Sequence, residues 1–115
     1  SVYASAATDY HGLIIIEYRA GRHRKYVKAR GMFTVSLGDE VSISSEYGEA
    51  VLNIVSIRHS HKTIMYFVYG SGVFMGHETP LKGIIIIHKG RISIHLGYKH
   101  HDSATSIVFR GVSSS

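Results

Sequence analysis

The pattern of hydrophobic and polar residues is clearest in residues 83–96, which read GIIIIHKGRISIHL. Four consecutive isoleucines, a Lys89-Gly90 pair and a run in which every second residue is apolar predict a tight β-hairpin with a two-residue turn. The register that pairs His88 with Arg91 leaves the first strand apolar on both faces and its partner apolar on one. Something must therefore cover the second face of the isoleucine strand.

Residues 12–28, GLIIIEYRAGRHRKYVK, predict a second hairpin of the same kind, with Ala20-Gly21 as its turn. In that register Glu17 faces Arg24 across the hairpin. The first strand is again apolar on both faces, and the second strand is mostly polar.

The rest of the chain predicts further short strands, at residues 32–37, 40–45, 50–58, 63–69 and 105–112. Turn signals separate them at residues 38–39, 47–48, 59–61, 70–72, 79–80 and 100–103. No stretch has the spacing of an amphipathic helix. Eight to ten short strands predict an all-β fold, either an antiparallel β-sandwich of jelly-roll type or a small barrel. The expected core is Ile14, Ile16, Val51, Ile54, Ile64, Phe67, Ile85, Ile87, Ile92, Ile94 and Val108.

The length of 115 residues fits one domain. Residues 1–11 are small and polar, and we expect them to form an N-terminal arm before a single β domain of residues 12–115. Residues 35–57, VSLGDEVSISSEYGEAVLNIVSI, resemble the succession of strands and glycine turns found in small β-barrels. This resemblance implies a fold and no function.

Several function classes are excluded or disfavoured by composition. The chain has no Cys, which excludes disulfides, thiolate catalysis and cysteine metal sites. No apolar run is long enough for a membrane span, and no motif calls for a cofactor. The absence of Gln and Trp and the single Asn favour a durable protein in an exposed setting, extracellular or on a virion.

Positive charge points to an anionic partner. Thirteen Lys and Arg against eight Asp and Glu give a net charge of +5, and nine His can add to it at low pH. This balance suggests nucleic acid or another polyanion. The candidate binding residues cluster in the first hairpin: Arg19, Arg22, Arg24, Lys25, Tyr26, Lys28 and Arg30. The alternative is that these charges only protect a free sheet edge.

Histidines give a weaker signal. His59 with His61, and His100 and His101 with Asp102, could form a His/Asp metal site. Neither group has the spacing of a known metal motif, so we interpret them as loop histidines and expect no metal site. His77 and Glu78, together with His88 or His95, could perform acid-base nuclease chemistry if the fold brought them together.

Three classes of function remain. The leading interpretation is a non-enzymatic structural protein, a filament or virion subunit that forms a homo-oligomer by β-strand or sheet augmentation. Its contact residues would be the outer apolar side chains of the two hairpins, Leu13, Ile15, Ile84 and Ile86. The first alternative is a nucleic-acid-binding β domain that uses residues 19–30, and the second is a His-dependent nuclease-type enzyme.

Overall fold

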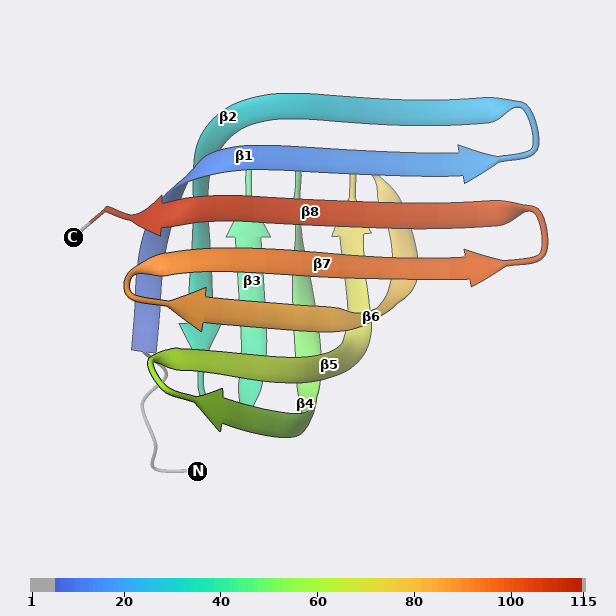
Figure 1. Cartoon of the computed structure of the whole chain (residues 1–115). Coiled ribbons are helices and arrows are strands. Elements are labelled where there is room, and N and C mark those ends of the chain that lie inside the picture. Colours follow the sequence, from blue (N-terminus) through green and yellow to red (C-terminus); the bar gives the residue numbers. More distant parts are fainter. Residues whose placement is uncertain (1–5, 115) are drawn as a thin grey trace.

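The computed structural model describes residues 6–114, which form eight antiparallel strands (Figure 1). Each strand pairs with the next, and β1 also pairs with β8, so that the sheet closes into a barrel. The all-β prediction is confirmed, and of the two predicted architectures the chain forms the barrel. The strands are β1 (Ala6–Ala20), β2 (His23–Leu37), β3 (Glu40–Ser45), β4 (Gly48–Ser60), β5 (Thr63–Phe74), β6 (His77–His88), β7 (Arg91–His100) and β8 (Ser103–Ser113).

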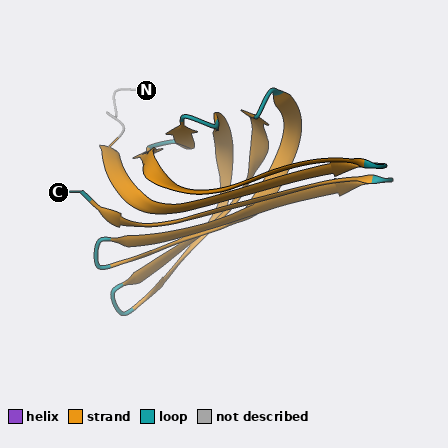
Figure 2. Ribbon diagram, turned by 90° about the horizontal axis from the view of Figure 1, so that it is seen from above, coloured by secondary structure: helices purple, strands orange, loops and turns teal. Residues whose placement is uncertain are grey.

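The barrel is flattened into two layers whose strands cross, because several strands bend from one layer into the other (Figures 1 and 2). The front layer, with its turns, consists of residues 13–30, 54–69 and 82–113. The back layer, with its turns, consists of residues 6–12, 31–53 and 70–81. The β1–β2 and β7–β8 hairpins extend beyond the back layer at one end of the molecule.

The hairpin of residues 83–96 has the predicted register, with His88 paired to Arg91 and positive φ angles of 49° at Lys89 and 76° at Gly90. The predicted register of the first hairpin is wrong. Its turn is one residue later, so Glu17 pairs with Tyr26. Gly21 has a φ of 58°, a conformation that glycine adopts without the steric cost of a side chain.

The turns predicted at residues 70–72 and 79–80 are also wrong, because both segments lie inside β5 and β6. A Cβ atom on Gly70 would be 2.3 Å from the Val51 carbonyl oxygen, so this glycine permits a close approach between strands. Pro80 lies where β6 pairs only with β5, and its missing N–H removes no ladder hydrogen bond there.

The core lies between the two layers and includes an aromatic cluster, in which the ring centroids of Phe33 and Phe109 are 4.9 Å apart. Three of the expected core residues face outward: Val51 is 49% exposed, and Phe67 and Val108 are half-buried. The next residue along, Leu52, Val68 or Phe109, is buried instead. In apolar runs such as VLNIV, sequence alternation does not determine which side chain points inward.

Residues 6–11 of the expected N-terminal arm belong to β1 and pair with β2. Residues 1–5 of that arm lie outside the described residues. Within residues 6–114 there is no helix long and apolar enough to cross a membrane.

Candidate nucleic-acid interface

Charges of opposite sign are separated between the two layers of the barrel. All thirteen Lys and Arg residues belong to the front layer, together with only two carboxylates, Glu17 and Asp102. The back layer, as described from residue 6, has no Lys or Arg. It contains the other six carboxylates, Asp9, Asp39, Glu40, Glu46, Glu49 and Glu78.

The resulting charge difference is large for a protein of 12.7 kDa. Thirteen cations and two acids leave the front layer at +11, and six acids leave the back layer at −6, which together give the net +5 of the chain. Such a separation produces a strong local potential at each face and raises the concentration of oppositely charged ligands near it.

Alternation along the strands places most of the front-layer cations on its outer face, away from the core. Nine exposed cations share this face: Arg19, Arg24, Lys28, Arg30, Arg58, Lys82, Arg91, Lys99 and Arg110. Among the described residues, Glu17 is the carboxylate on the same face, and it forms an ion pair of 2.7 Å with Arg24. We call this face the basic face.

The seven binding residues predicted from the sequence do not all lie on one surface. Five of the seven predicted residues lie on the basic face: Arg19, Arg24, Tyr26, Lys28 and Arg30. Arg22 lies in the β1–β2 turn. The side chain of Lys25 points to the opposite side, where its Nζ donates a hydrogen bond of 3.3 Å to the Met75 carbonyl oxygen.

The other cations of the basic face were missed by the sequence analysis: Arg58, Lys82, Arg91, Lys99 and Arg110. They come from β4, β6, β7 and β8, where no local cluster of charges marks them. Only strand order and register bring them beside the first hairpin, since β8 pairs with β1 and β7 pairs with β8.

A groove of about 710 Å³ crosses four neighbouring strands on the basic face, β2, β1, β8 and β7. Its lining includes Arg30, Arg91, Arg110 and His11, and no carboxylate. Gly31, Gly12 and Gly111 lie side by side under the groove, and their Cβ positions are directed inward, toward core side chains such as Phe33 and Ile14. The outer surface of the groove is therefore formed by the side chains that alternate with these glycines, which include Arg30 and Arg110.

Aromatic side chains accompany the cations. Tyr26 is 48% exposed on the β2 edge of the basic face, and the Arg24 guanidinium lies 4.7 Å from its ring centroid. Tyr69, near the opposite edge, is 55% exposed. The Arg58 guanidinium lies 5.5 Å from the ring of Phe67. Exposed rings beside cations are the usual components of a site for unpaired bases.

The residues expected to mediate self-association also lie on this outer face. Leu13, Ile15, Ile84 and Ile86 are half-buried, because neighbouring strands place apolar side chains such as Val108 beside them. The back layer packs on the other face of the same strands and does not cover them. Self-association through these residues stays a prediction.

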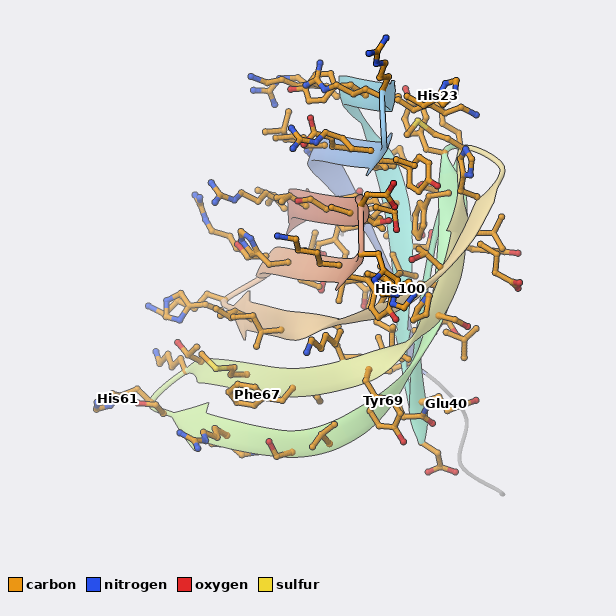
Figure 3. All side chains as sticks on the ribbon, turned by 90° about the vertical axis from the view of Figure 1, so that its right-hand side faces the viewer. His23, Glu40, His61, Phe67, Tyr69 and His100 are labelled. Carbon is orange, nitrogen blue, oxygen red and sulfur yellow. The ribbon has the colours of Figure 1, made fainter. Side chains whose placement is uncertain are left out.

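Three histidines considered for nuclease chemistry lie apart. His77 begins β6 and stacks on Tyr18 at 4.1 Å between ring centroids. His88 ends the same strand and shares a hydrogen bond of 2.8 Å with the Thr63 hydroxyl, while His95 lies in the middle of β7. Other histidines are also separated in space: in Figure 3, His61 lies far from His23 and from His100. Within residues 6–114 no three His, Asp or Glu side chains gather as metal ligands would.

A comparison of the chain with protein-family models, curated proteins and solved structures found no match.

Proposed function

We propose that the protein binds single-stranded nucleic acid along the basic face. The observation that carries this proposal is the confinement of all thirteen Lys and Arg residues to the front layer. A backbone of phosphates lying across that layer would replace its condensed counterions with protein cations, and the released counterions would drive binding. The same contacts would not depend on base sequence.

The aromatic residues support a single strand over a duplex. Unpaired bases can stack on exposed rings, with about 1–3 kcal/mol per stacked base. Tyr26 and Tyr69 offer such rings on the two sides of the basic face. The cross-strand row that joins the two tyrosines is Glu17, Ser106, Gly97 and Lys82. The groove lined by Arg30, Arg91 and Arg110 lies further along the same strands and offers phosphates a path beside this row.

Fluorescence anisotropy with a labelled single-stranded oligonucleotide at about 50 and 200 mM salt tests the proposal. The test variant replaces three cations of the basic face by alanine, Lys28, Arg30 and Arg110. A matched control replaces three cations that lie elsewhere, Lys25, Lys62 and Lys89, and removes the same charge. A duplex of the same sequence serves as competitor.

We expect the unaltered protein to bind more weakly at the higher salt concentration. The basic-face variant should lose on the order of tenfold in affinity, and the slope of log K against log salt should fall by about 2, since three phosphate contacts are lost. The control should change neither quantity much. Equal losses in both variants would show that overall charge, and not this face, determines binding.

A further inference from the structure

We infer that the back layer of one copy docks onto the basic face of a second copy, so that molecules stack front to back. The evidence for this inference is separate from that for nucleic-acid binding, and a docked copy would compete with nucleic acid for the same basic face. The inference rests on two outer faces of one chain that are complementary in charge and that both carry exposed or half-buried apolar side chains.

The outer face of the back layer carries carboxylates, small polar side chains and two exposed valines. Two cross-strand rows form it. One row is Asp9, Thr34, Ser44, Glu49, Val73 and Glu78, and the other is Ala7, Ser36, Ser42, Val51, Ser71 and Pro80. Val51 and Val73 are 49% and 43% exposed. A hollow of about 340 Å³ contains both valines, and Glu49 and Glu78 also line it.

The basic face has the matching arrangement with the opposite charge. One cross-strand row runs from Arg30 to Arg58 through Leu13, Arg110, Ser93, Ile86 and Met65. The adjacent row adds Ile15, Val108, His95, Ile84 and Phe67. Apolar side chains and cations are thus interspersed on this face, with Arg110 between Leu13 and Ser93. Facing surfaces of opposite charge would steer two copies together and set their orientation.

The size and symmetry of the molecule fit a stack. Its extents of 43 × 28 × 27 Å give faces of the size at which a standard interface buries about 800 Å² per partner. The two contacting surfaces differ, so the contact is heterologous. Any such stack exposes a basic face at one end and an acidic face at the other, so further copies can add, and repetition then produces an open filament or a ring.

Two charge-reversed variants test the stack, with oligomeric state measured by analytical ultracentrifugation after nuclease treatment. Glu49→Lys/Glu78→Lys changes only the back layer, and Arg30→Glu/Arg110→Glu changes only the basic face. The control Asp39→Lys/Glu46→Lys makes the same charge change in two turns of the back layer. Circular dichroism confirms that each variant is folded.

We expect the unaltered protein and the turn control to form oligomers at low salt that dissociate as salt increases. Each reversed variant alone should sediment as a monomer, whereas an equimolar mixture of the two should assemble, because every contact again joins opposite charges. A monomeric unaltered protein at low salt, or oligomers that persist in both reversed variants, would overturn the inference. A mixture that stays monomeric would also overturn it.

Discussion

Glu17 accepts a hydrogen bond of 2.7 Å from the Arg24 Nε, and this contact joins the carboxylate of the basic face to one of the nine cations there. The pair is exposed, with side-chain exposures of 55% for Arg24 and 29% for Glu17. Exposed ion pairs of this kind contribute at most about 1 kcal/mol to stability. The carboxylate therefore matters more for the potential of the face than for the fold.

Glu17→Gln should consequently strengthen oligonucleotide binding. The substitution removes a negative charge from the basic face and frees Arg24, and we expect affinity to rise by about 0.5 kcal/mol, roughly twofold. The free energy of unfolding should change by less than about 1 kcal/mol. Anisotropy titrations and urea denaturation measure the two effects. Weaker binding would mean that the ion pair, and not Arg24 alone, contacts the ligand.

Tyr26→Ala separates base stacking from phosphate contact. If a base stacks on this exposed ring, the substitution should weaken oligonucleotide binding by about 1–3 kcal/mol. The slope of log K against log salt should stay the same, because no cation is lost. Tyr26→Phe keeps the ring and should bind as the unaltered protein does. Identical affinities for the alanine and phenylalanine variants would exclude stacking at this position.

Gly12→Ala tests the bend through which β1 passes from the back layer to the front layer. A Cβ atom at this position would be 2.0 Å from the Arg110 carbonyl oxygen, so the backbones of β1 and β8 would have to separate. We expect the substitution to cost about 1–3 kcal/mol of unfolding free energy or to prevent folding.

Gly31 pairs with Gly12 across β1 and β2 and provides the matched control. A Cβ atom on Gly31 would be 3.6 Å from the Ile14 Cδ1, an ordinary contact. Gly31→Ala should thus stay within about 1 kcal/mol of the unaltered protein in urea denaturation. If both substitutions lower the free energy of unfolding by the same amount, the close approach of β1 and β8 at Gly12 does not account for the loss.

Tyr10 should make the free energy of unfolding depend on pH in the alkaline range. Burial raises the pKa of its hydroxyl above the usual 10.0, and the nearby Tyr66 raises it further. The unfolded chain would lose this proton near pH 10, while the folded chain keeps it to higher pH. Between these two values the folded state binds more protons, so the free energy of unfolding falls as pH increases through that range.

Tyr10→Phe should remove part of that alkaline loss. Urea denaturation at about pH 9 and 11 would show a smaller drop in unfolding free energy for the variant than for the unaltered protein. Tyr26→Phe, at an exposed tyrosine, provides the comparison. An equal drop in all three proteins would indicate that Tyr10 ionises alike in the folded and unfolded states.

Local sequence patterns predicted those parts of the fold that depend on neighbours in the chain. The register at Lys89-Gly90 was correct because turn residues and alternating isoleucines agree there. At Ala20-Gly21 the alternation alone could not distinguish two registers that differ by one residue on each strand, since both preserve the faces. In the structure the turn is Gly21-Arg22, with the positive φ angle at Gly21.

The candidate interface could be predicted only in part for a different reason. Six cations between Arg19 and Arg30 are adjacent in sequence, and their clustering is visible without a fold. Arg58 and Arg110 join the same face only through the closure of β1 on β8 and the order of the intervening strands. The acidic back layer escaped notice for the same reason, because its six carboxylates are scattered between residues 9 and 78.

The most direct test of the basic face as the nucleic-acid site is a map of amide chemical shifts by NMR while a single-stranded oligonucleotide is added. Binding at the basic face should shift amides near Lys28, Arg30 and Arg110 and leave those of Ser42 and Val51 in the back layer unchanged. The measurement should be made at a salt concentration where the protein alone is monomeric. Shifts concentrated on the back layer, or spread evenly over both layers, would contradict binding at this face.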